Sequence, residues 1–146
     1  MKIQDQDLFH GAALTQIVQH ESFKALNRGS KTKYGHYLIN TNRHVFVKYR
    51  KPNQSPWQHT FSEDEIDAIA NQIKKRQKVF LCLVCGKTTV CALRIAEIKR
   101  VLDMKGEGQQ WVRVEVPKGG RCHVSGSNGR LAKTVAHSAF PEKVFV

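Results

Sequence analysis

The chain has 146 residues, of which 40% are hydrophobic and 25% charged, a composition typical of one globular domain. No apolar run approaches the roughly 20 residues of a membrane span, and the N-terminal residues turn acidic where a secretion signal would turn apolar, so we expect a cytoplasmic protein without a membrane partner. Lys and Arg number 24 against 12 Asp and Glu, and the net charge of +12 bears on partners and solubility rather than on fold.

Hydrophobic periodicity predicts the elements of the first half of the chain. They are a helix over residues 7–26 and three strands over residues 36–40, 44–50 and 57–61. A second helix is expected to start at Ser62, because Ser62 and Glu65 have the spacing of a capping box. The acidic residues that follow Ser62 suit the positive end of a helix dipole.

The second half begins with its most apolar segment, residues 78–85, which is typical of a central strand buried on both faces. The elements expected after it are a strand over 89–93, a helix over 94–103 and a β-meander over 110–116, 121–125 and 131–135. An Asn-Gly pair at Asn128 predicts a tight hairpin within the meander. The sequence therefore predicts one α+β domain over residues 1–146, in which helices flank a central mixed sheet in the order α-β-β-β-α-β-β-α and an antiparallel meander follows.

The positive charge is segregated along the chain. Residues 22–62 contain no Asp or Glu and eight Lys or Arg, and residues 116–141 form a second acid-free stretch with four. Segregated cations indicate an anionic partner. We expect this partner to be nucleic acid, with DNA favoured over RNA, and we expect no cofactor and no bound metal. An accessory subunit that binds an acidic protein is an alternative that the charge permits equally.

The strand at residues 44–50 supplies the candidate binding face. Side chains alternate along a strand, so the set Val45, Val47 and Tyr49 is expected in the core, and the other face carries His44, Phe46, Lys48 and Arg50. Cations beside an aromatic ring suit phosphates and a stacked base. The residues expected to bind nucleic acid are Lys31, Lys33, Arg43, His44, Phe46, Lys48, Arg50, Lys51, Asn53 and Gln54.

The order of elements up to residue 85 resembles the common core of the PD-(D/E)XK restriction-endonuclease-like superfamily, and residues 86–146 would extend it. The resemblance implies a DNA-cleaving fold in which strand carboxylates hold a divalent metal. The matching strands, 44–50 and 57–61, contain no carboxylate, although Mg²⁺ normally requires one or two. A nuclease with a non-standard site, using Mg²⁺, is therefore the second alternative, and its candidate catalytic residues are Glu21, His44, Lys48 and His59.

The spacing of Cys82 and Cys85 resembles a zinc motif, but on a strand these two positions point to opposite faces. The sequence contains no second CxxC pair. We therefore expect the cysteines to be reduced and buried rather than metal ligands.

Overall fold

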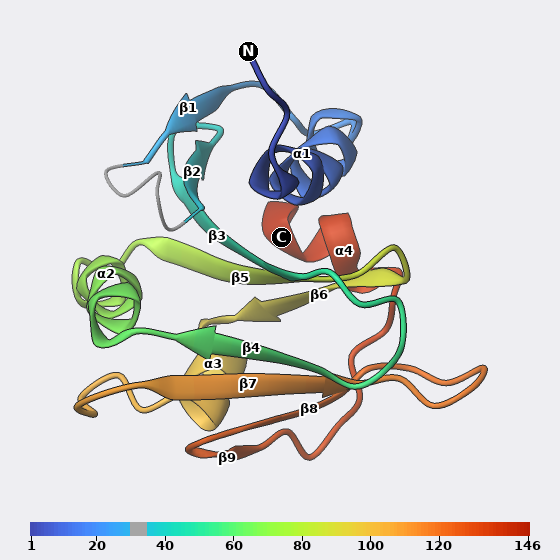
Figure 1. Ribbon diagram of the computed structural model, residues 1–146. Coiled ribbons are helices and arrows are strands. Elements are labelled where there is room, and N and C mark those ends of the chain that lie inside the picture. The colour runs from blue at the N-terminus through green and yellow to red at the C-terminus, as the bar shows by residue number, and fades with distance from the viewer. Residues whose placement is uncertain (30–34) are drawn as a thin grey trace.

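Two β-sheets and the helices around them form the computed structural model, which describes residues 1–29 and 35–146 (Figure 1). Sheet A contains, in spatial order, β1 (Leu26–Arg28), β2 (His36–Ile39), β3 (Arg43–Arg50), β5 (Lys78–Cys85) and β6 (Thr89–Arg94). Sheet B contains β4 (Trp57–Phe61), β7 (Gln110–Glu115), β8 (His123–Gly126) and β9 (Gly129–Arg130). The helices are α1 (Asp5–Val18), α2 (Glu63–Lys74), α3 (Ile95–Val101) and α4 (Ala139–Glu142), and α4 runs into the 3-10 turn η2 (Lys143–Phe145). None of the helices in the described ranges is long and apolar enough to cross a membrane.

Sheet A is mixed, as the sequence predicts. Its strands β3 and β5 pair in parallel, and all its other neighbouring strands pair antiparallel. After its first residue, every residue of β5 is buried, which confirms that this strand is central. One face of sheet A is covered by α1 and by the segment that contains α4 and η2. The opposite face packs against sheet B, α2 and α3.

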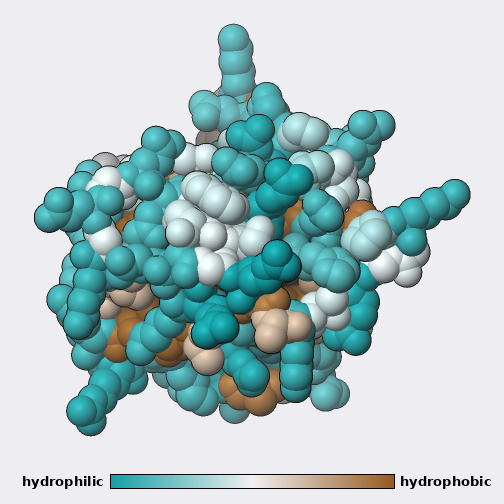
Figure 2. All heavy atoms as spheres, turned by 90° about the horizontal axis from the view of Figure 1, so that it is seen from below, coloured by the Kyte–Doolittle hydropathy of each residue, from teal (hydrophilic) through white to brown (hydrophobic). Residues whose placement is uncertain are grey.

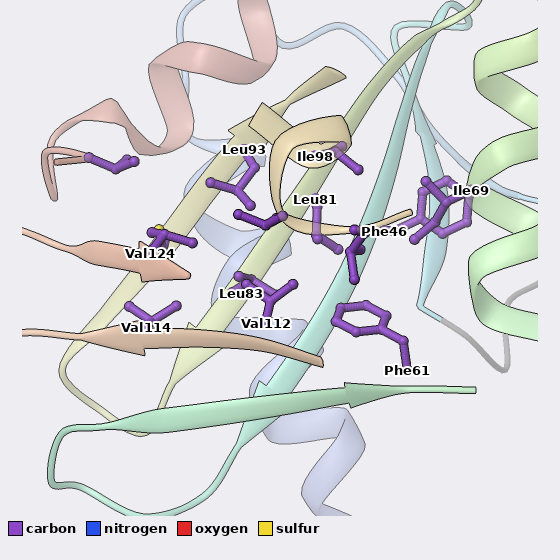
Figure 3. Close-up of a cluster of buried hydrophobic side chains, with 14 of the residues drawn as sticks. Phe46, Phe61, Ile69, Leu81, Leu83, Leu93, Ile98, Val112, Val114 and Val124 are labelled. Atoms are coloured by element: carbon purple, nitrogen blue, oxygen red, sulfur yellow. The ribbon is translucent and has the colours of Figure 1, made fainter. Parts of the chain in front are cut away.

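The larger core lies between the two sheets (Figure 3). Leu81 and Leu83 of β5 point toward Val112 and Val114 of β7, and Phe61 of β4 lies beside them. Ile69 of α2 and Ile98 of α3 complete the cluster. These apolar side chains are buried against each other, and their burial holds the inner face of sheet B against sheet A. The other face of sheet B is consequently turned to solvent.

The capping box at the start of α2 forms as predicted. The Ser62 hydroxyl accepts a hydrogen bond from the Glu65 amide, and one carboxylate oxygen of Glu65 accepts the Ser62 amide at 3.1 Å. This reciprocal pair satisfies two amide groups that would otherwise lack partners at the helix start. Glu65 is thereby held in one position, facing β3.

Besides adding β1, α4 and η2, which the sequence does not predict, the structure changes three predicted elements. The first helix ends at Val18 rather than at residue 26, so Glu21 lies in a turn and not on the helix. Residues 131–135 are not a strand; β8 pairs instead with the short β9, and only Val135 forms an isolated bridge, to Cys122. The strand at residues 57–61 forms, but it pairs with β7 in sheet B and not with β3 in the central sheet.

All four cysteines are buried, as predicted, and none is paired in a disulfide. Cys82 packs in the core beneath α1, whereas Cys85 packs in the core between the sheets. The two side chains therefore point to opposite faces of β5, as the strand geometry predicts.

Candidate nucleic-acid interface

The face of β3 that carries His44, Phe46, Lys48 and Arg50 is not the open surface that the sequence predicts. Phe46 is 3% exposed and belongs to the core between the sheets. Its ring stacks on His36 of β2 with centroids 4.3 Å apart. The expectation that Phe46 stacks on a base is therefore wrong, because sheet B and α2 cover the middle of this face.

Lys48 has a structural partner on α2. Its ammonium forms an ion pair with the second carboxylate oxygen of Glu65, and the two side chains are 25% and 14% exposed. The same ammonium lies 5.1 Å from the centre of the Phe61 ring. The space between these residues is about 10 Å³, which holds no more than a water molecule. A phosphate or a metal-bound substrate has no room there.

The four candidate catalytic residues do not form one recognisable catalytic cluster, although the charge of Lys48 acts on His59. His44 lies in sheet A and contacts His36, with a ring nitrogen of each 2.8 Å apart. His59 lies in sheet B, is fully buried and contacts the Cys85 sulfur at 3.7 Å. Glu21 is exposed in the turn after α1. In the described part of the chain, no three His, Cys, Asp or Glu side chains gather as a metal site would require.

Three of the remaining predicted binding residues are engaged within the protein. Arg43 donates to the backbone oxygens of Val144 and Phe145, at 2.7 and 3.4 Å. The Lys51 ammonium pairs with Asp5 at 3.0 Å, and the Asn53 side-chain oxygen accepts the Lys87 amide. Arg50 and Gln54 are exposed, and Lys31 and Lys33 lie outside the described residues.

A different aromatic and cationic surface lies on the outer face of sheet B. Val112 and Val114 of β7 are buried, so the alternating residues Trp111, Arg113 and Glu115 point outward. The strand register extends this face over the whole sheet. The outer face of sheet B comprises Gln58, Thr60, Trp111, Arg113, Glu115, His123, Ser125 and Arg130.

The register aligns polar residues in a row across the four strands of sheet B. Gln58 of β4 lies opposite Arg113 of β7, Arg113 opposite Ser125 of β8, and Ser125 opposite Arg130 of β9. Adjacent strands are about 4.8 Å apart, so the two arginines lie about 10 Å apart with a hydroxyl between them. This row presents two cations and two neutral hydrogen-bonding groups on one surface.

A groove of about 460 Å³ lies beside this row. Its charged lining consists of Arg113, Arg130 and Lys133 against one carboxylate, that of Glu115, which lies 3.4 Å from the Arg113 guanidinium. Both side chains of that pair are more than 40% exposed, so water screens their attraction and Arg113 can exchange this partner for a stronger anion. The groove therefore has a net positive charge.

Figure 2 views the molecule from the side on which β7, β8 and β9 lie in Figure 1. Hydrophilic residues cover most of this side, and apolar residues appear only in separate small patches. Such a surface favours a charged partner over an apolar one.

No protein-family model, curated protein or solved structure matches this chain. The interpretation of the groove therefore rests on its own residues. The sequence contained a signal for it, because Trp111 and Arg113 alternate with apolar residues and Arg130 and Lys133 lie in the second acid-free stretch. The signal is hard to recognise in the sequence, because Trp111 and Arg113 are far along the chain from Arg130 and Lys133. Pairing of the strands brings these residues together on one face.

The lowered pKa values of two buried histidines lead us to expect that the protein loses stability in mild acid. Burial, with a smaller contribution from Lys48 and Arg50, lowers the pKa of His59 to about 3. Burial, and next the charge of His44, lowers the pKa of His36 to about 4. Both pKa values in the folded protein lie below the ordinary value of 6.5. Between pH 6.5 and the folded-state pKa of each histidine, the unfolded chain therefore binds more protons than the folded protein, and stability falls as the pH drops below 6.5.

From pH 6.5 to pH 5, His59 alone is expected to reduce the free energy of unfolding by about 2 kcal/mol. Urea unfolding at pH 5, 6 and 7.5 measures this loss. The variant His59→Gln should show a correspondingly flatter dependence over the same range. Equal slopes for the two proteins would contradict the assignment of the loss to His59.

Proposed function

We propose that this chain binds nucleic acid through the outer face of sheet B and the groove beside it. The observation that carries the proposal is the groove itself, in which Arg113, Arg130 and Lys133 face a single carboxylate on a chain of net charge +12. Guanidinium groups form paired hydrogen bonds with phosphate oxygens, which makes phosphates the natural ligands of this surface. DNA, favoured over RNA, is the form of the partner that we propose, and the oligonucleotide titration described below compares the two.

The arrangement supports binding more than catalysis. Phosphodiester hydrolysis by a nuclease of the resembled kind requires carboxylates that hold a metal. The groove supplies one carboxylate, and that group is paired with Arg113. The four free, buried thiols suit a reducing compartment, and we place the function in the cytoplasm for that reason.

Fluorescence anisotropy with labelled DNA and RNA oligonucleotides, titrated between about 50 and 300 mM salt, tests the proposal. For about four phosphate contacts, the logarithm of the association constant should fall with the logarithm of salt at a slope between −3 and −4. A slope near zero would contradict binding through phosphates. No binding of any oligonucleotide at 50 mM salt would overturn the proposal and leave an acidic protein as the expected partner.

The same oligonucleotides incubated with Mg²⁺ or Mn²⁺, with and without chelator, separate binding from cleavage. We expect the nucleic acid to be retained and to remain intact in every sample. Stoichiometric protein that cuts the oligonucleotide, with the cutting abolished by chelator, would overturn this expectation in favour of the nuclease alternative.

A further inference from the structure

Trp111 gives the outer face of sheet B a second kind of binding group. Its indole is partly exposed, on the same side of β7 as Arg113 and opposite Thr60 of β4 in the strand register. Residues two apart on one strand lie about 7 Å from each other, so an aromatic surface and a guanidinium stand side by side. This pairing can hold a base and the phosphate attached to it at the same time.

The neighbouring residues extend the same chemistry. Gln58 and Ser125 flank Arg113 in the register and offer an amide and a hydroxyl, which can bond to the edge of a base. The groove also has apolar lining, from Pro117, Val124 and Leu131. Apolar walls and neutral hydrogen-bonding groups add nothing to the attraction for phosphates alone, but they suit an unpaired base.

A duplex cannot use these groups in the same way. Its bases are stacked on each other, so no base within it can lay its ring on Trp111. A single strand can turn its bases toward the protein, where they stack on exposed aromatic side chains while cations follow the backbone. The groove begins at Arg113, and Trp111 lies outside it, on the other side of Arg113 along β7. Its volume of about 460 Å³ is of the size that holds a small ligand, so it can admit the nucleotide next to the one on Trp111.

Resting on the proposed function, we infer that the nucleic acid bound by this chain is single-stranded, with one base stacked on Trp111 and the adjoining phosphates held by Arg113 and Arg130. The cations and the tryptophan of this face then have separate roles. The cations supply attraction to either form of nucleic acid, and Trp111 supplies the preference for the unpaired form.

The second tryptophan makes a spectroscopic test possible. Trp57 is 2% exposed, and its indole nitrogen donates to the Pro52 oxygen at 2.6 Å, so a ligand on the outer face cannot reach it. A change in tryptophan fluorescence on binding therefore reports on Trp111. Base stacking is expected to quench that emission, whereas binding of phosphates at a distance is not.

The experiment compares a single-stranded DNA oligonucleotide of 12 nucleotides with its duplex, in anisotropy and in tryptophan emission, for the native chain, Trp111→Ala and Trp111→Phe. We expect the single strand to bind at least about tenfold tighter than the duplex and to quench the emission. Trp111→Ala should weaken single-strand binding about tenfold, Trp111→Phe should retain most of it, and neither variant should change duplex binding. Thermal unfolding of each variant confirms that the fold is intact.

Two failures can be told apart. If the duplex binds as tightly as the single strand and Trp111→Ala changes neither, the inference is overturned while the proposed function stands. If neither form binds, the proposed function itself is overturned.

Discussion

Replacement of Lys48 by Met is expected to lower the free energy of unfolding by about 2–3 kcal/mol. The variant keeps an unbranched apolar stem beside Phe61 but removes the ammonium that pairs with Glu65. The Glu65 carboxylate is 14% exposed, so it cannot recover this loss by hydration. Urea unfolding at pH 7.5 measures the difference.

Lys51 provides the matched control. It lies three residues further along the chain and also pairs with a carboxylate, that of Asp5. That pair is 64% and 52% exposed, and exposed pairs contribute little because water and salt screen them. Lys51→Met is therefore expected to change the free energy of unfolding by less than about 0.5 kcal/mol.

The double variant Lys48→Met/Glu65→Gln identifies the cause of the loss. The amide oxygen of the introduced glutamine would still accept the Ser62 amide at the start of α2, but no unpaired charge would remain. We expect the double variant to recover much of the stability that Lys48→Met loses. If Lys48→Met and Lys51→Met cost the same, the ion pair of Lys48 with Glu65 would not be a structural contact that stabilises the fold.

Much of the fold could be predicted from the sequence because its signals are local. The apolar run of β5, the capping box at Ser62 and the Asn-Gly hairpin each depend on a few neighbouring residues, and all three form. The position of β4 depends on long-range pairing. Its sequence predicts a strand correctly but does not show whether β3 or β7 is the neighbour.

The candidate site was predictable only in part for the same reason. Alternation correctly separates the two faces of β3, but it does not show which face a second sheet will cover. The eight cations of residues 22–62 indicated a binding surface on the face of β3 that sheet B and α2 cover. The charge of Lys48 on this face is neutralised by Glu65, an acidic residue outside that stretch. The groove on sheet B combines Arg113 with Arg130, which are brought together by pairing of β7, β8 and β9.

Removal of the two arginines is expected to produce the largest loss of nucleic-acid binding. At 50 mM salt, each phosphate contact to a single strand is worth a factor of about seven to eight, so Arg113→Gln/Arg130→Gln should weaken binding about 50-fold. The salt dependence should become shallower by about 1.4 units of slope, since two contacts are lost. Glutamine is chosen because it leaves no new charge beside Glu115.

The control variant is Lys74→Gln/Lys75→Gln. Both lysines lie at the end of α2, on a different element from the groove, and the change in net charge is the same. A partner attracted only by the overall charge of the chain would respond equally to both variants. A partner seated on sheet B would respond to the arginines alone, with less than about a threefold change for the lysines.

The anisotropy of a labelled single-stranded oligonucleotide at 50 mM salt, measured with the native chain and these two variants, tests the claim that sheet B carries the binding surface. Circular dichroism and thermal unfolding establish that all three proteins are folded. We predict a loss of about 50-fold for Arg113→Gln/Arg130→Gln and near-native affinity for Lys74→Gln/Lys75→Gln. Equal affinities of the two variants, whether weakened or native, would contradict the claim and show that the groove on sheet B is not where nucleic acid binds.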